Sequence, residues 1–183
     1  LLAVFGPSGL KTTGAAPQPP VPGCKDGVPY LLYGVAGVGT DDVTYLYVLD
    51  QMTGKPVLVG PVGFDNVSAL AFDAGGTLYG VGRIAATTTA VLLTIDHCTG
   101  VGTQVAPITG VDNFLAADIT FDANGTLYYN GWNTATLAVE IGTLDTATGA
   151  ATRIGGDGVC CGNGIAFASD GTFYTSYSRV GQV

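Results

Sequence analysis

The chain has 183 residues, of which 47% are apolar and only 11% are charged, and its formal net charge is −8. This length is enough for one domain with a hydrophobic core, and the acidic balance argues against nucleic acid or an anionic membrane surface as a partner. No apolar run approaches the roughly 18 residues of a membrane-spanning helix, so no membrane insertion is expected.

The first residues are apolar and predict a strand; they are Leu1, Leu2, Ala3, Val4 and Phe5. Residues 15–29 are rich in proline and predict an extended connection. From residue 30 onward the chain is repetitive. We therefore expect one domain over 1–183, in which 1–14 supply strands, 15–29 form the connection and 30–183 form the repeats.

The repeat is carried by a hairpin-like segment that occurs three times in full. Residues 72–81 read FDAGGTLYGV, residues 121–130 read FDANGTLYYN and residues 167–176 read FASDGTFYTS, while 30–35 give a partial copy. The aligned tyrosines are Tyr33, Tyr79, Tyr128 and Tyr174, at intervals of 46, 49 and 46 residues. A regular period in this range indicates a solenoid, a propeller or another array.

Each full unit offers about four short strands separated by turn residues, and no helical periodicity is present. The expected strands cover 30–35, 44–50, 55–60, 67–73, 77–83, 90–96, 101–106, 126–132, 138–145, 150–154, 164–168 and 172–178. Four strands per unit predict an all-β fold, a β-propeller of about four four-stranded blades. The last blade lacks outer strands, so the N-terminal strand of the same chain or of a neighbouring chain is expected to complete it.

The F-D-x-x-G-T-L-Y hairpins and the turns of the D-x-x-T-G kind resemble the blades of secreted bacterial β-propeller repeat proteins. The resemblance covers about residues 30–178 and implies the architecture. It implies no particular activity, because propellers host many functions.

The recurring aspartates and tyrosines have a structural and a functional interpretation. Asp50, Asp96 and Asp145 precede Thr-Gly turns, and Asp73, Asp122 and Asp170 lie in the hairpins. Capping of turn N–H groups is favoured over a repeated cation site, because such turns require Asp and Gly at these positions. The aligned tyrosines are expected to pack between blades rather than to line a carbohydrate-binding face.

Weak candidates for ligand contact are the off-pattern aromatics Trp132 and Tyr129, together with the loop residues Asp112 and Phe114. No catalytic residue, metal site or cofactor is expected. The single histidine, His97, adjoins Cys98, but neighbouring residues at a strand end point apart and do not make a catalytic pair.

Covalent features are suggested by cysteines and by sequons. The four cysteines, Cys24, Cys98, Cys160 and Cys161, are disulfide candidates, with Cys24 bridging one of the adjacent pair or Cys98 meeting another subunit. Asn66 and Asn124 fit the N-glycosylation pattern. Thr87, Thr88 and Thr89 are candidates for O-linked sugar.

These observations predict a non-enzymatic structural or adhesive module at the cell surface or outside the cell. It would form fibres by exchanging strands with other copies of itself, since sparse charge weakens the protection against association. A propeller that binds glycans or peptides is the alternative. A metal-dependent propeller lactonase or hydrolase ranks last, because the inner strands offer mostly Ala, Leu and Ile where such enzymes need acidic or Asn ligands.

Overall fold

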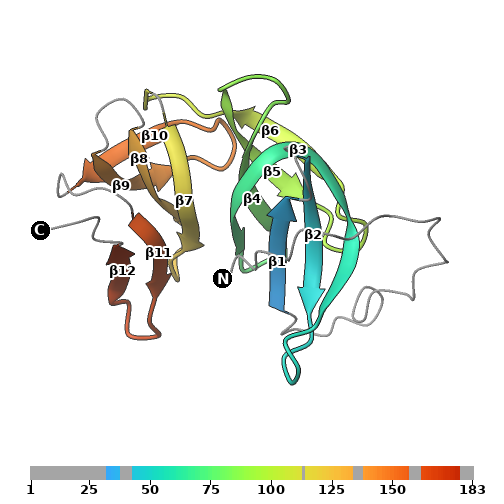
Figure 1. The fold of residues 1–183 in the computed structure, drawn as a ribbon. Helices are drawn as coiled ribbons and strands as arrows, with labels where there is room; N and C mark the ends of the chain where they lie inside the picture. Colours follow the sequence, from blue (N-terminus) through green and yellow to red (C-terminus); the bar gives the residue numbers. More distant parts are fainter. Residues whose placement is uncertain (1–31, 38–42, 113, 134–137, 157–161, 178–183) are drawn as a thin grey trace, which may run out of the picture.

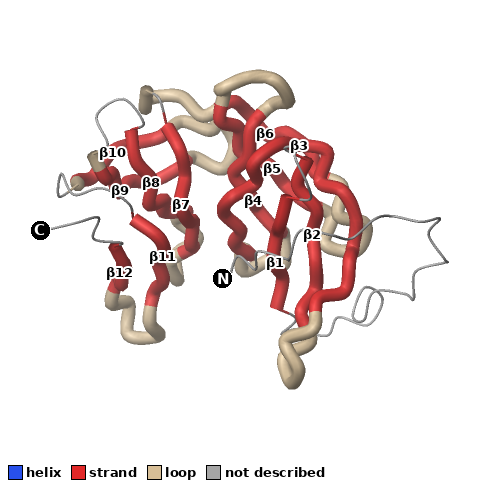
Figure 2. Tube along the Cα trace, viewed as in Figure 1, coloured by secondary structure: helices blue, strands red, loops and turns tan. Residues whose placement is uncertain are grey.

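The computed structural model describes residues 32–37, 43–112, 114–133, 138–156 and 162–177, and within these ranges the chain is all-β (Figures 1 and 2). The strands are β1 (Leu32–Gly37), β2 (Val43–Leu49), β3 (Pro56–Phe72), β4 (Leu78–Arg83), β5 (Ala90–Ile95), β6 (Gly102–Pro107), β7 (Phe114–Phe121), β8 (Leu127–Asn133), β9 (Val139–Leu144), β10 (Ala151–Gly155), β11 (Gly162–Phe167) and β12 (Phe173–Tyr177). No helix in the described ranges is long and apolar enough to cross a membrane. The strand expected at residues 1–5 lies outside them.

The strands form antiparallel meanders. One sheet has the order β1-β2-β3-β4-β5-β6, a second has the order β10-β9-β8-β7, and β11 pairs with β12. Tight turns make this order possible, since antiparallel neighbours need only a short connection. We define the first unit as β1, β2 and the start of β3, the second unit as the end of β3 with β4–β6, the third unit as β7–β10, and the fourth as β11–β12.

The separate strands predicted at 55–60 and 67–73 are wrong, because the structure joins them into the single strand β3. The strand bends instead of ending. Asn66 has a φ of 48°, and the pairing of β3 with β4 shifts register between Asp65 and Ala69. An irregularity of this kind interrupts the pairing locally and bends the strand, and the pairing resumes beyond it. β3 therefore passes from the first unit into the second.

Successive units pack against each other through their first strands, as in a propeller. β7 contacts β3 on one side and β11 on the other, and Figure 1 shows β7 at the edge of its sheet that faces the sheet containing β3. The core between the second and third units contains Ala69, Val81, Phe114 and Ile119. The propeller-like architecture expected from the repeat is therefore present, and β3, β7 and β11 are its inner strands.

The aligned tyrosines do pack between units, which confirms the structural interpretation for three of them. Tyr33 meets Phe72 at a ring-centroid distance of 5.5 Å, and Tyr128 meets Phe167 at 5.0 Å. In each pair the tyrosine of one unit contacts the hairpin phenylalanine of the next. The fourth, Tyr174, is 60% exposed.

The recurring aspartates cap turns, also as predicted. Asp145 Oδ1 accepts the N–H groups of Ala147 and Thr148 at 2.9 and 2.8 Å. In the hairpins, Asp122 Oδ1 accepts the N–H groups of Asn124 and Thr126 at 2.9 and 2.8 Å. These bonds satisfy turn donors that have no ladder partner.

Candidate functional site

The structure separates the four residues that the sequence suggested as ligand contacts. Tyr129 and Phe114 are core residues, 0% and 6% exposed, and their rings meet edge to face at 5.0 Å. Asp112 is exposed. Trp132 is half-buried and lies on the face of β8 opposite to Tyr129, because side chains alternate along a strand. These four residues therefore do not form one site.

The candidate glycan acceptors are all at the surface. Asn66 is exposed on the bend of β3, and Asn124 is exposed in the third-unit hairpin, where its amide Nδ2 donates to Asp122 Oδ2 at 3.4 Å. Thr87, Thr88 and Thr89 are exposed in the β4–β5 turn. Accessibility permits modification at these positions, and their glycosylation stays a prediction.

Among the cysteines, Cys98 lies in the described ranges and is disulfide-bonded. Cys24, Cys160 and Cys161 lie outside them. A disulfide sulfur is not a thiolate nucleophile, so Cys98 offers no catalytic pairing with His97.

A buried polar cluster lies between the third and fourth units. Asp118 on β7 is 8% exposed and Asn130 on β8 is 0% exposed. The two residues are direct partners across the strand pair, which places their side chains on one face with Cβ atoms about 5 Å apart. Both are directed toward the fourth unit, as their hydrogen bonds show.

The bonds of this cluster cross the interface between the units. Asp118 Oδ2 accepts the Ile165 N–H at 3.0 Å, and Oδ1 accepts the Ile119 N–H at 2.9 Å. The Asn130 amide Nδ2 donates to Thr175 Oγ1 at 3.0 Å. Asn130 Oδ1 is buried and has no hydrogen-bond partner, which is costly for an amide oxygen unless a further group binds there.

Burial governs the protonation of the cluster. Desolvation raises the pKa of Asp118, although the N–H groups of Ile165 and Ile119 act in the opposite direction. Removing a carboxylate from water disfavours its charged form, and this raises the pKa. On the other face of β8, burial raises the pKa of Tyr129 to about 12, so that hydroxyl stays protonated at neutral pH.

The equivalent positions in the second unit are apolar. With the hairpin phenylalanines aligned, Asp118 and Asn130 correspond to Ala69 and Val81 in the second unit. Ala69 and Val81 belong to the apolar core between the second and third units. In the fourth unit the same positions are Gly164 and Ser176. A carboxylate opposite an amide therefore occurs only in the third of these three aligned units, a signal that emerges when the strands on both sides of each hairpin are compared.

The protein side chains of the cluster supply few ligands for a metal ion. No group of three or more His, Cys, Asp or Glu side chains in the described ranges is arranged to hold one. Both oxygens of Asp118 already accept N–H groups, and Asn130 Oδ1 adds a single oxygen. Calcium takes six to eight oxygen ligands, more than Asp118 and Asn130 supply by themselves.

No model of a known protein family matches the chain, and no curated protein matches it. Solved structures are similar in their arrangement of sheets. A gluconolactonase from Xanthomonas campestris shares 14% identity over 79% of this chain and 45% of its own length, with a TM-score of 0.48. A protein from Bacteroides uniformis assigned as a 6-phosphogluconolactonase shares 16% identity over 80% and 47%, with a TM-score of 0.48.

A structure from a nidogen/laminin complex is also similar, with 20% identity over 75% of this chain and 52% of that one and a TM-score of 0.49. The chain thus spans about half the length of the solved structures it matches. At these identities the likeness concerns the fold alone.

The functional prediction made from the sequence needs correction. Structures similar to this chain include proteins named as lactonases, so the prediction of a non-enzymatic structural or adhesive module, and of a self-assembling fibre subunit, is wrong. The inner part of the fold is also more polar than expected, because Asp118 and Asn130 place a buried carboxylate and a buried amide where mostly Ala, Leu and Ile were expected.

Proposed function

We propose that the chain is part of a propeller hydrolase that opens an ester or lactone bond in a small polar molecule, with Asp118 as its proton-transfer group. The observation that carries the proposal is the pairing of Asp118, a carboxylate 8% exposed, with the wholly buried Asn130, whose Oδ1 has no partner. Buried carboxyl groups with a raised pKa occur preferentially at functional sites.

The chemistry assigns a different task to each side chain. Asp118 accepts a proton from a water molecule as that water's oxygen attacks the carbonyl carbon of the substrate. Asn130 Oδ1 accepts a hydrogen bond from the other O–H of the same water and so orients it. When the carbonyl–oxygen single bond breaks, the proton returns from Asp118 to the departing oxygen, which leaves an acid and an alcohol.

Holding Asn130 in place is the task of the fourth unit. The Thr175 hydroxyl accepts the Asn130 Nδ2–H, which fixes the amide with Oδ1 directed away from Thr175. Asp118 is fixed in the same way by the Ile165 N–H. Positioning by locked partners is what a general base requires.

Acid release from glucono-δ-lactone and from p-nitrophenyl acetate, followed with a pH indicator and by absorbance, tests this function. Asp118→Asn should lower kcat/KM by about 100-fold or more, which is the usual share of general-base catalysis. The control is Asp122→Asn, which alters an exposed turn carboxylate nearby in the sequence and should leave the rate unchanged. Equal rates for the wild type and Asp118→Asn, or no hydrolysis of either substrate, would refute the proposal.

We also propose that a propeller of about four blades is completed within the chain by the N-terminal strand of residues 1–5. Support comes from Tyr174, which is 60% exposed where its counterparts contact the next unit. Slow amide hydrogen exchange at residues 2–5 in the monomer is the expected result, and rapid exchange there would contradict it.

A further inference from the structure

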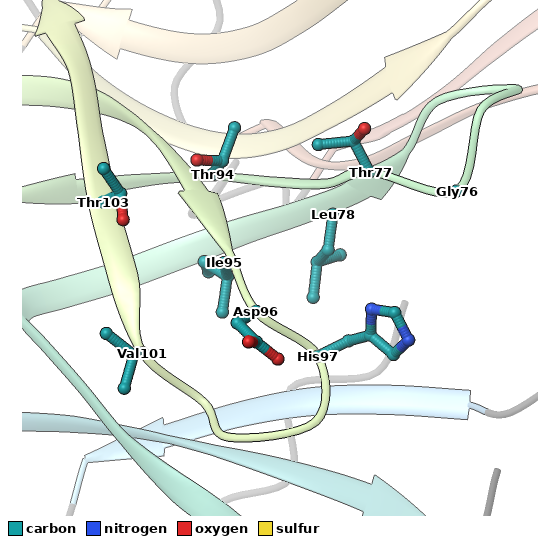
Figure 3. Close-up of a pocket in the computed structure, with 9 residues that line it drawn as sticks. All are labelled: Gly76, Thr77, Leu78, Thr94, Ile95, Asp96, His97, Val101 and Thr103. Carbon is teal, nitrogen blue, oxygen red and sulfur yellow. The ribbon is translucent and has the colours of Figure 1, made fainter. Parts of the chain in front are cut away.

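A groove of about 460 Å³ opens at the turn end of the second unit, where β4 and β6 begin and β5 ends (Figure 3). It is distant in the fold from the Asp118 cluster, which faces the fourth unit. Three threonines contribute to its wall: Thr77 at the start of β4, Thr94 on β5 and Thr103 on β6. Asp96, His97 and Val101, which lie between β5 and β6, also line the groove.

The polar groups of the groove are neutral donors and acceptors apart from one carboxylate. Each threonine hydroxyl can donate one hydrogen bond and accept two. Asp96 is held in orientation because its Oδ1 accepts the N–H groups of Cys98 and Thr99 at 2.8 and 3.1 Å. With a chain charge of −8, this lining disfavours an anionic ligand and suits a neutral one with several hydroxyl groups.

His97 is fixed by packing and gives the groove a rigid edge. Its ring lies edge-on to Tyr33 and to Phe72, each at a centroid distance of 5.9 Å. Tyr33 and Phe72 contact each other at 5.5 Å. A turn anchored by three rings keeps its geometry in the free protein, and preorganisation of this kind favours binding.

The groove also has an exposed apolar side chain, although the turn itself does not need one. Val101 is 55% exposed and lines the same groove as the threonines. A sugar ring presents the same combination, with C–H faces flanked by hydroxyl groups. From this match we propose that the groove is a binding site for a neutral saccharide, separate from the hydrolytic centre.

In this site the three threonine hydroxyls and the Asp96 carboxylate bond the hydroxyl groups of the sugar, and Val101 contacts a C–H face. The third unit supplies matched positions for controls. Thr143 pairs with Tyr128 as Thr94 pairs with Tyr79, and Asp145 caps its turn as Asp96 does. His97 and Val101 are replaced there by Thr146 and Ala150.

The test is a titration of the full chain with the methyl glycosides of glucose, galactose, mannose and N-acetylglucosamine, followed by amide chemical shifts. At least one glycoside should shift the amides of Thr77, Thr94 and Thr103. Thr94→Val should weaken binding about three- to tenfold, the usual effect of one lost hydrogen bond. Asp96→Asn keeps the turn acceptor and should also weaken it, while Thr143→Val and Asp145→Asn should leave the affinity unchanged.

Two outcomes would overturn the site. One is the absence of shifts with all four glycosides. The other is binding that Thr94→Val and Asp96→Asn do not weaken, or that shifts the region of Trp132 instead. Because Thr94 is half-buried and Asn can cap the turn, both variants should fold, and their unchanged amide spectra away from the groove verify this. Hydrolytic activity is independent of these outcomes.

Discussion

Tyr79 of the second unit packs edge to face against Phe121 of the third, with ring centroids 5.4 Å apart and an angle of 63° between the ring planes. The Tyr33–Phe72 pair has nearly the same angle, 61°. The same pairing recurs between Tyr128 and Phe167. A contact repeated between successive units is a natural source of cohesion between them. Its contribution should therefore be measurable.

We expect a double-mutant cycle of Tyr79→Leu and Phe121→Leu to give a coupling of about 0.5–1.5 kcal/mol in the free energy of unfolding, the usual range for an edge-to-face pair. Urea denaturation provides the measurement. Tyr174→Leu serves as the control, because Tyr174 is 60% exposed, and it should change the stability little. A coupling of zero would mean that the rings contribute only through burial.

The glycine of the third-unit Thr-Gly turn meets two requirements at once. Gly149 has a φ of +70°, and a Cβ placed there would lie 2.5 Å from the backbone oxygen of Pro107 in the second unit. Gly100 has the same relation to the backbone of Gly60, with 2.7 Å to its oxygen. The turn glycine is thus set both by its own backbone and by the neighbouring unit.

Gly149→Ala should consequently destabilise the protein more than Gly54→Ala. Gly54 shares the φ of +70°, but a Cβ placed there would meet no atom within 4 Å, so its substitution should cost about 1–2 kcal/mol, the strain of a left-handed residue. Gly149→Ala adds overlap with backbone and should cost about 1–3 kcal/mol more. Urea midpoints of the two variants compare them directly, and equal losses would exclude the packing contribution.

Much of the fold was predictable because the turn chemistry is local. Asp50 and Asp145 cap their turns with the same pattern of bonds to the second and third N–H groups downstream, and this pattern can be read from four residues. The continuity of β3 could not be predicted, since the bend at Asn66 depends on pairing with strands on both sides. The register of the hairpin places Asp118 opposite Asn130, but the contacts of both residues with the fourth unit depend on packing between units, which the hairpin pattern alone does not reveal.

The turn aspartates should make the protein less stable in acid. Backbone N–H groups lower the pKa of Asp50 and of Asp145 below the ordinary value of 3.8. A folded-state pKa below the unfolded one gives stability that is present above the unfolded pKa and is lost as the pH falls through the folded one. Thermal midpoints measured from pH 6 down to about pH 2 should therefore fall most steeply below about pH 4.

Asp145→Asn distinguishes this mechanism from general charge effects, since Asn keeps an acceptor for the turn but does not titrate. The variant should lose less of its thermal midpoint over the same acid range than the wild type. Asp112→Asn is the charge-matched control. Asp112 is exposed, and among the described residues no backbone N–H is seen to bond its carboxylate. Parallel curves for the wild type and Asp145→Asn would contradict the assignment.

Asn130 allows function and stability to be separated. Its Oδ1 is buried without a partner, and its counterpart in the second unit is Val81, a core residue 2% exposed. Asn130→Val removes the uncompensated acceptor, and Thr175, which is half-buried, can then bond water. We expect the free energy of unfolding to stay the same or to rise by up to about 1 kcal/mol, while lactone hydrolysis falls by about tenfold or more because the attacking water loses its orientation.

Thr175→Val is the companion variant, because it frees the Asn130 amide without removing its oxygen. It should lower the rate of lactone hydrolysis without the gain in stability that Asn130→Val brings. Urea denaturation and the lactone assay, applied to both variants, give the two quantities side by side. A destabilised Asn130→Val with unchanged hydrolysis would instead identify Asn130 as a purely structural link between the third and fourth units.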